Sequence, residues 1–223
     1  MNHRSLVQGL AALLLGLLCA GLAPAQDRGS ASQNKMYVGG AIGRVGYDTD
    51  FERTKAVIRG TGATSFTVTA NGTDTAWKGY FGYLASRHFS VEAGYWNLGQ
   101  LDLSAAVTAP ASTVLQRHYR ADGYGADAVV WLPVYNSWSG LVKAGAMLTN
   151  VKASASEPGG GLTALPAESA RKLNAHWGVG LEYRFTPAAA VRFEYETIRK
   201  VGDESKFGTA DVILWTLGAN YRF

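Results

Sequence analysis

Cysteine is nearly absent from this sequence, charged residues are scarce, and no long apolar run follows the first 25 residues. The single cysteine, Cys19, lies near the amino terminus, so the rest of the chain has no disulfide framework, no thiolate metal site and no cysteine nucleophile. Charged residues make up 17% of the 223 residues, against roughly 25% in an ordinary soluble domain. Beyond residue 25 no stretch approaches the roughly 20 apolar residues that a transmembrane helix needs. The 27 glycines follow no fixed period, which excludes a helical bundle and a collagen-like repeat.

The first 25 residues have the features of a secretory signal peptide. A basic start and an apolar stretch over 10–22 precede an A-x-A cleavage site that ends at Ala25. We expect cleavage between Ala25 and Gln26, then a short polar segment over 26–35 and a single domain over 36–223. The alternative, lipoprotein acylation of the cysteine, requires a small residue before it, and a leucine stands there.

From residue 36 onward, strand-like segments alternate with loops. The segments are longer than the five or six residues usual for soluble strands, and they match the nine to eleven of a tilted membrane strand plus its ends. Short links alternate with long ones, as in an outer-membrane barrel with short periplasmic turns and long outer loops. The eight predicted strands cover 36–45, 75–85, 88–100, 119–132, 139–152, 172–185, 189–199 and 211–223. The short links are 86–87, 133–138 and 186–188, and the long ones are 46–74, 101–118, 153–171 and 200–210.

Side-chain alternation indicates what surrounds these strands. In the last segment the apolar residues from Ile213 to Phe223 share one face, and polar or small residues occupy the other. Trp177 and Phe185, eight residues apart on one apolar face, would span about 20 Å of height at a tilt of about 40°. A soluble sandwich would bury such aromatics, whereas here the opposite face is polar. We therefore expect an all-β, eight-stranded antiparallel up-and-down transmembrane β-barrel. Its aromatic girdles would comprise Trp77, Tyr83, Phe89, Tyr95, Trp138, Trp177, Phe185 and Trp215.

Successive side chains of a strand point alternately to lipid and to the lumen, and this parity predicts equal numbers of positive and negative charges inside the barrel. An eight-stranded barrel is just wide enough for side chains to fill it, so these groups would interlock as ion pairs. Two interpretations follow: these charged side chains plug the lumen, or they line a small gated pore. We expect His176, in the same layer, to be a hydrogen-bonded partner of these groups. The predicted interior network comprises Lys78, Glu92, Asp127, Lys143, Glu182, Arg184, Arg192, Glu194, Glu196 and Arg222.

Three segments resemble the small eight-stranded outer-membrane barrels typified by outer-membrane protein A and outer-membrane protein X. The segments are VEAGYWNLG (91–99), VRFEYETIRKVGD (191–203) and LGANYRF (217–223). The likeness implies a location in the outer membrane of a Gram-negative bacterium. It also implies that the barrel-assembly machinery reads the terminal strand through Tyr221 and Phe223. Such proteins often carry a peptidoglycan-binding domain after the barrel, and because this sequence ends at Phe223 the likeness does not imply peptidoglycan tethering.

No motif in the sequence identifies an active site. The H-x-S motif at His88 and Ser90 lies next to a short periplasmic turn, whereas an enzyme modifying lipid A needs its nucleophile toward the outer leaflet. His118 has no serine and carboxylate at the spacing of a triad, and the nearby Arg117 and Arg120 suit a basic rim for lipopolysaccharide phosphates or a solvated loop. There is no metal-ligand spacing and no basic stripe. We expect no cofactor, no metal and no nucleic-acid partner.

The predicted function is therefore structural, or one of surface interaction. The barrel would support envelope integrity, and its long loops would be available for adhesion or for a host or surface ligand. The predicted partners are outer-membrane lipid, lipopolysaccharide and the barrel-assembly machinery. A small gated pore for passive transport is the second hypothesis, and an enzyme acting on lipid A is the third.

Overall fold

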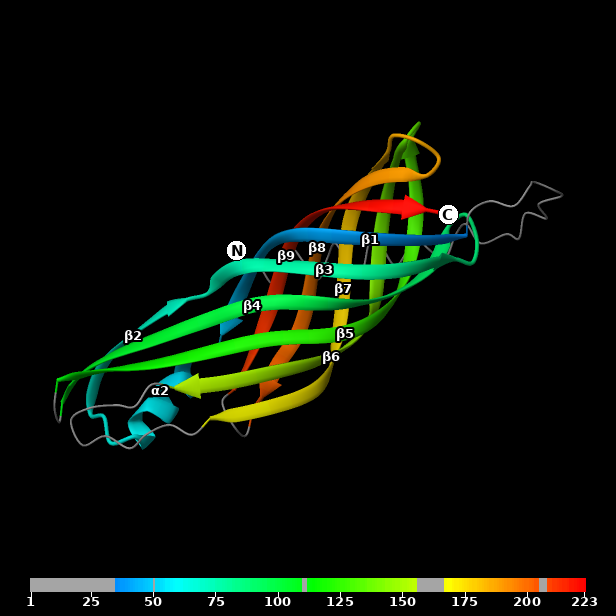
Figure 1. The fold of residues 1–223 in the computed structure, drawn as a ribbon. Helices are drawn as coiled ribbons and strands as arrows, with labels where there is room; N and C mark the ends of the chain where they lie inside the picture. Colours follow the sequence, from blue (N-terminus) through cyan, green and yellow to red (C-terminus); the bar gives the residue numbers. More distant parts are fainter. Residues whose placement is uncertain (1–34, 50, 110–111, 156–166, 205–207) are drawn as a thin grey trace, which may run out of the picture. The chain divides into compact units, whose positions relative to one another are not determined.

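The computed structural model describes residues 35–49, 51–109, 112–155, 167–204 and 208–223 (Figure 1). The predicted leader, its cleavage site and most of the polar segment after it lie outside these residues. The described chain contains nine strands and one helix, and none of its helices has the length and apolarity needed to cross a membrane. The elements are β1 (Met36–Thr49), α2 (Phe51–Gly60), β2 (Ser65–Asn71), β3 (Thr73–Leu84), β4 (Phe89–Ala109), β5 (Thr113–Tyr135), β6 (Trp138–Ala155), β7 (Glu168–Arg184), β8 (Ala189–Asp203) and β9 (Gly208–Arg222).

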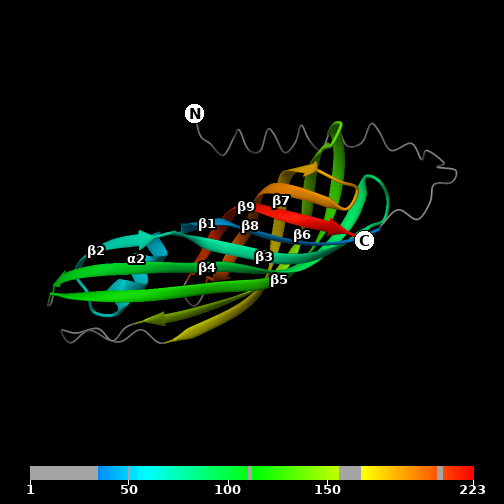
Figure 2. The ribbon, with the colours of Figure 1, turned by 45° about the horizontal axis from the view of Figure 1, so that its top comes forward.

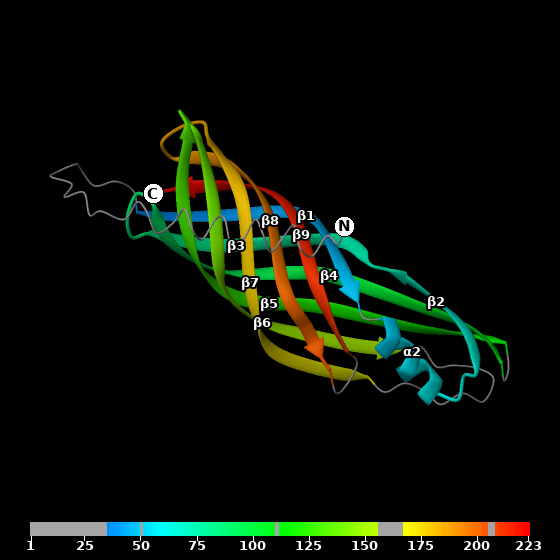
Figure 3. The same ribbon diagram turned by 180° about the vertical axis from the view of Figure 1, so that it is seen from behind.

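Eight of the strands form a closed antiparallel ring. β1 pairs with β3 on one side and with β9 on the other, and each remaining strand pairs with its neighbours in the chain. Pairing of β4 with β5 closes the ring, and the tilted strands can be followed around it from behind in Figure 3. The prediction of an eight-stranded up-and-down barrel is confirmed, and each predicted segment lies on its own ring strand. β2 is a ninth strand outside the ring.

Several of the predicted links differ from the structure. The long loop over 101–118 is mostly a hairpin, because β4 continues to Ala109 and β5 begins at Thr113. These residues lie beyond the apolar band, so their side chains carry no lipid-facing pattern to reveal a strand. The link over 133–138 is shorter than predicted, since β5 runs through Pro133 to Tyr135 and only a tight turn remains. Asn136 in that turn adopts φ 46°, the left-handed conformation that asparagine tolerates.

The predicted loop over 46–74 is also wrong, because it contains α2 and β2 (Figure 2). β4 pairs with β3 up to Asn97 and with β2 from Asp102 onward. The change of partner occurs at a bulge where Gly99 has φ +72° and where a Cβ would lie 2.7 Å from the Asp74 carboxylate. β2, α2 and the outer parts of β4 and β5 share a small apolar core of Ile58, Ala63, Ala105, Val107 and Leu115. We call this assembly the extracellular extension, because it lies at the end opposite the short turns, which face the periplasm in outer-membrane barrels. It is defined by the described residues of 51–71 and 101–119.

Inward side chains fill the ring in three layers. Leu141, Lys143 and Met147 follow one another along β6 and belong in turn to a periplasmic aromatic layer, an ionic layer and an upper apolar layer. In the aromatic layer Tyr37 lies against Gly82, where a Cβ would be 2.0 Å from the tyrosine Cζ. A glycine is therefore required at this position for the ring of Tyr37 to point inward.

Candidate functional site

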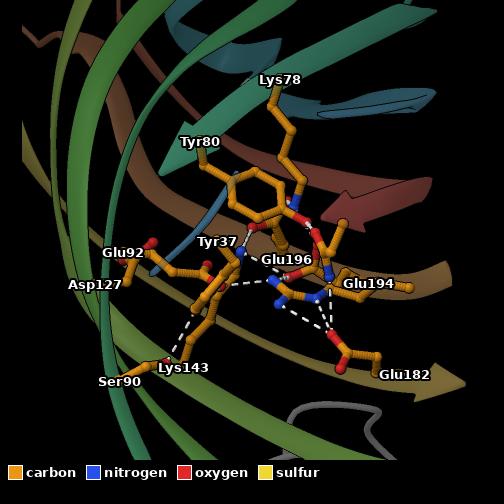
Figure 4. Close-up of polar contacts among 12 residues, drawn as sticks. Tyr37, Lys78, Tyr80, Ser90, Glu92, Asp127, Lys143, Glu182, Glu194 and Glu196 are labelled. Atoms are coloured by element: carbon orange, nitrogen blue, oxygen red, sulfur yellow. Dashed lines mark hydrogen bonds and ion pairs between the residues drawn. The ribbon is translucent and has the colours of Figure 1, made fainter. Parts of the chain in front are cut away.

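The ionic layer is centred on one lysine from β3, one lysine from β6 and two glutamates from β8 (Figure 4). Lys78 Nζ lies 2.8 Å from Glu196 Oε2 and also binds Glu194. Lys143 Nζ lies 2.9 Å from Glu194 Oε1 and also contacts Glu196. All four side chains are at most 2% exposed. Each lysine therefore bridges both carboxylates, and β3, β6 and β8 are tied together across the lumen.

Arg192 holds the periplasmic side of the same layer. Its Nη1 donates to Glu92 Oε1 at 2.6 Å and its Nη2 to Glu182 Oε2 at 3.3 Å. Its guanidinium lies 4.9 Å from the ring centroid of Trp131 and 5.0 Å from that of Tyr80. These aromatic rings replace part of the water that a charged group loses on burial. The arginine is thus ion-paired on one side and covered by aromatic rings on the other.

The structure brings all ten sequence-predicted charges to the inner face. Eight of them are at most 2% exposed, whereas Arg222 and Arg184, near the periplasmic end, have side chains 14% and 36% exposed. Both of these arginines approach Glu182 Oε1, at 3.0 and 3.5 Å. His176 Nδ1 lies 2.8 Å from Asp127 Oδ1.

Prediction from charged residues alone missed the neutral members of this network. Tyr37 donates its hydroxyl to Glu92 Oε1 at 2.7 Å, and Asn220 donates to Glu182 Oε2 at 2.8 Å. Ser90 accepts from Trp131 Nε1 at 2.8 Å. All of them have the inward parity of the charges, so counting every polar or aromatic residue of that parity would have found them.

An apolar layer covers the ionic layer on the extracellular side. Trp96, Leu98, Met147, Ile198 and Leu214 are each at most 1% exposed and belong to one cluster with smaller aliphatic residues. This apolar layer was not predicted, because the charged residues of inward parity were expected to fill the whole lumen. The residues of this layer alternate with the lipid-facing residues on the upper parts of the strands. Apolar residues at these inward positions are the sequence signal that could have predicted the layer.

Aromatic side chains on the outer face lie at two heights. Near the outer end of the spanning region the ring centroids of Trp77 and Tyr95 are 5.4 Å apart, and those of Tyr195 and Trp215 are 4.6 Å apart. Trp177 continues this upper row, 6.2 Å from Tyr195. The lower row lies beside the short turns and contains the remaining predicted residues, Tyr83, Phe89, Trp138 and Phe185. Tyr221 and Phe223 of the terminal strand are 57% and 51% exposed on the same outer face.

An apolar pocket lies at the extracellular mouth of the barrel, above the upper apolar layer. Tyr47, Tyr119, Leu101 and Val201 are among its lining residues. The Tyr47 hydroxyl donates to the carbonyl of Leu98 at 2.6 Å, and burial together with the charge of Asp74 raises its pKa above the usual range. The hydroxyl therefore stays protonated, and the pocket wall carries no ionised group at this position.

The candidate catalytic and rim residues are not brought together. His88 is exposed in the turn, whereas Ser90 is buried inside the barrel, so the H-x-S motif does not form a pair. His118 Nδ1 contacts Asp102 Oδ1 at 2.7 Å on the outer face. Arg117 points inward and binds Glu168 at 3.1 Å, so neither interpretation offered for it, a lipopolysaccharide-binding rim or a solvated loop charge, is correct. Within the described ranges, no three His, Cys, Asp or Glu side chains are arranged to hold a metal ion.

A closed ring with a lipid-compatible outer face and an interior filled by side chains, including buried ion pairs, defines the class of small membrane β-barrels. The chain belongs to the family described as the outer membrane protein beta-barrel domain, which it matches over residues 10–223. It is accordingly a protein of the outer membrane.

Relatives and solved structures of similar proteins agree with this assignment. Outer membrane protein A of Salmonella typhi is 27% identical over 143 residues, covering 64% of this chain and 38% of that protein. Outer membrane protein A of Yersinia pseudotuberculosis serotype I is 25% identical over 215 residues, covering 96% of this chain and 54% of that protein. The chain thus spans about half or less of the length of these relatives.

Two solved structures share the fold at low identity. The outer membrane protein OprG of Pseudomonas aeruginosa superposes with a TM-score of 0.54 at 11% identity, covering 86% of this chain and 98% of OprG. Neisserial surface protein A superposes with a TM-score of 0.51 at 13% identity, covering 87% of this chain and all of that protein.

Proposed function

We propose that this protein is a non-conducting outer-membrane barrel that supports the envelope and binds a surface or host ligand through its extracellular extension. The observation that carries the proposal is a lumen filled by ionic and apolar layers beneath an ordered extracellular extension with its own core. In this proposal the protein has no catalytic role. Its partners are outer-membrane lipid, lipopolysaccharide, the barrel-assembly machinery during biogenesis, and the ligand of the extension.

The filled lumen argues against the gated pore. A conducting path needs continuous polar walls or a constriction that can wet. Trp96 and Leu214 belong to a buried apolar layer above the ionic layer, so rearranging the ion pairs would still leave a dry barrier. Opening a pore would therefore require both layers to move.

The extension argues for a task outside the cell. β4 and β5 have 21 and 23 residues, against 12 in β3. The nine residues from Leu101 to Ala109 add about 30 Å of strand beyond the spanning part. Strands of this length are not needed to cross the bilayer, and surface-exposed segments on a rigid scaffold commonly carry binding.

The pore hypothesis is tested by planar-bilayer recording of the refolded protein. We expect no channel openings from the wild type or from Arg192→Ala, because the apolar layer remains in both. Frequent openings of the wild type would refute the non-conducting proposal. Openings of Arg192→Ala alone would show that the ionic layer is the only barrier.

The surface role is tested by a truncated variant in which residues 51–71 and 101–119 are each replaced by a short Gly-Ser linker. Cells producing the wild type, the truncation or a control with Asn136 and Ser137 replaced by glycines are compared for adhesion to epithelial monolayers and for resistance to detergent. We expect the truncation to lose adhesion and keep detergent resistance, and the control to keep both. Equal adhesion of the wild type and the truncation would refute the surface-interaction role.

A further inference from the structure

Three cationic side chains lie on the outer face of β5, β6 and β7, just above the apolar band. Tyr124, Leu148 and Leu173 are paired across these strands and are 66%, 41% and 67% exposed, which makes them the last apolar row. Arg171 lies two residues beyond this row on β7, on the same face. Arg120 and Lys152 lie four residues beyond it, on β5 and β6. All three cations are exposed, and we call them the outer cationic cluster.

The outer cationic cluster has an unfavourable arrangement unless an anion joins it. Arg120 and Lys152 are direct cross-strand partners, and like charges directly opposite each other destabilise a sheet. In the described part of the chain neither of them makes an ion pair, and Arg171 makes none either. Arg199 on the outer face of β8 is neutralised by contrast, since its Nε lies 3.1 Å from Asp211 Oδ2.

One carboxylate lies within the same patch. Asp122 is two residues from Arg120 on the same face of β5, and it accepts a long hydrogen bond of 3.4 Å from Asn150 Nδ2. With three cations and one anion the patch has a net charge of about +2, which a doubly charged phosphate matches.

The height of the cluster fits the headgroup region of the outer leaflet. Two and four residues along a strand correspond to about 7 and 14 Å, or about 5 and 10 Å of height at a tilt of about 40°. The polar region of a bilayer occupies about 5 to 8 Å on each side of the hydrocarbon core. Long arginine and lysine side chains on this face therefore reach the level at which lipid phosphates lie.

We propose that the outer cationic cluster of Arg120, Lys152 and Arg171 is a binding site for the phosphate groups of an outer-leaflet glycolipid of the lipid A type. Arginine offers paired donors to phosphate oxygens, and lysine contributes a point charge. The side chains face outward in the same rows as the lipid-facing residues, so the occupant is a membrane lipid rather than a soluble anion. This inference rests on the proposed function, which counts lipopolysaccharide among the partners, and it names the site of that contact. It does not depend on ligand binding by the extracellular extension, so the site and the surface-interaction role can fail separately.

The test uses protein refolded in dodecylmaltoside micelles and titrated with lipid A carrying two phosphates, with bound lipid counted by native mass spectrometry. The variant is Arg120→Gln, Lys152→Gln, Arg171→Gln. A charge-matched control, Lys35→Gln, Arg44→Gln, Arg87→Gln, removes three cations elsewhere, including Arg44 on the outer face of β1. A boiled and unboiled gel verifies that each variant is folded.

We expect the triple variant to bind lipid A at least about tenfold more weakly, and the control to stay within about twofold of the wild type. Dephosphorylated lipid A should bind the wild type and the triple variant equally. The variant Arg120→Lys, Arg171→Lys, which keeps the charges, should retain most of the affinity. If the triple variant does not fold, Lys152→Gln alone replaces it and should still weaken the binding of lipid A.

Two results would overturn the proposal. Equal affinity of the wild type and the triple variant for lipid A would show that the cluster does not bind its phosphates. Binding of soluble heparin as tight as that of lipid A, lost in the same variant, would assign the cluster to a soluble polyanion instead of a membrane lipid.

Discussion

Replacing Arg192 by methionine tests whether the ionic layer stabilises the barrel through charge pairing. The change removes the cation that lies 2.6 Å from Glu92 and 3.3 Å from Glu182. Glu182 keeps Arg222 at 3.0 Å, whereas Glu92, among the described residues, keeps the hydrogen bond from the Tyr37 hydroxyl at 2.7 Å and no ion pair. One carboxylate is thus left buried and unpaired.

The expected loss in free energy of unfolding is about 3 to 5 kcal/mol, the usual cost of breaking a buried ion pair from one side. In the double variant Arg192→Met, Glu92→Gln the stranded charge is gone, and we expect at least half of that loss to be recovered. The exposed pair of Arg199 and Asp211 serves as the control, since its arginine side chain is 58% exposed. Arg199→Met should therefore cost less than about 1 kcal/mol.

The assay is equilibrium unfolding in urea of protein refolded into lipid vesicles, followed by tryptophan fluorescence and by gel mobility without boiling. A loss below about 1 kcal/mol for Arg192→Met would contradict the argument from buried charge. A double variant as unstable as the single one would show that the cost arises from lost packing on the aromatic rings instead.

Three further predictions concern other parts of the chain. Gly82→Ala should destabilise the barrel by about 1 to 3 kcal/mol in the same urea assay, because the added Cβ would overlap the inward ring of Tyr37. Gly79→Ala on the same strand should be nearly neutral, because a Cβ there meets nothing within 4 Å. Equal losses of stability in the two variants would refute the steric explanation. Phe223→Ala should lower the fraction of assembled protein in outer-membrane preparations if the terminal aromatic is read during assembly, and Leu217→Ala in the same strand should not; equal yields would count against that role. His88→Ala should leave the lipid A profile of cells unchanged in mass spectrometry, and a shifted lipid A mass would reopen the enzymatic hypothesis.

The ring strands could be predicted because lipid imposes a strict pattern on them. A strand between hydrocarbon and a narrow polar lumen must alternate, as the run from Ile213 to Phe223 does. The same alternation assigned Lys143 and Glu196 to the interior, but parity gives only the face of a residue and not its partner across the lumen. Those pairings depend on ring closure and register, which the sequence does not display.

The extension could not be predicted because the lipid constraint ends at the upper aromatic row. Beyond this row, one face of β4 contacts water and the other contacts α2 and its neighbours. Polar residues such as Asp102 and Thr108 are therefore typical of a loop, and this segment was predicted as one. Arg117 was misassigned for the same reason. Its inward direction follows from the continuation of β5, and its pairing with Glu168 follows from the continuation of β7.

The change of pairing partner on β4 separates the ring from the extracellular extension, so that one part can be altered without the other. The pairing of the eight ring strands does not involve β2. β2 pairs only with β4, along the edge that β3 no longer occupies beyond Asn97. A foreign segment that bridges the end of β1 and the start of β3 can therefore replace residues 51–71 without shifting any pairing in the ring, because closing a surface loop costs little more when the loop is lengthened. The molecule is thus a natural scaffold for grafting peptides or small domains onto a bacterial cell surface.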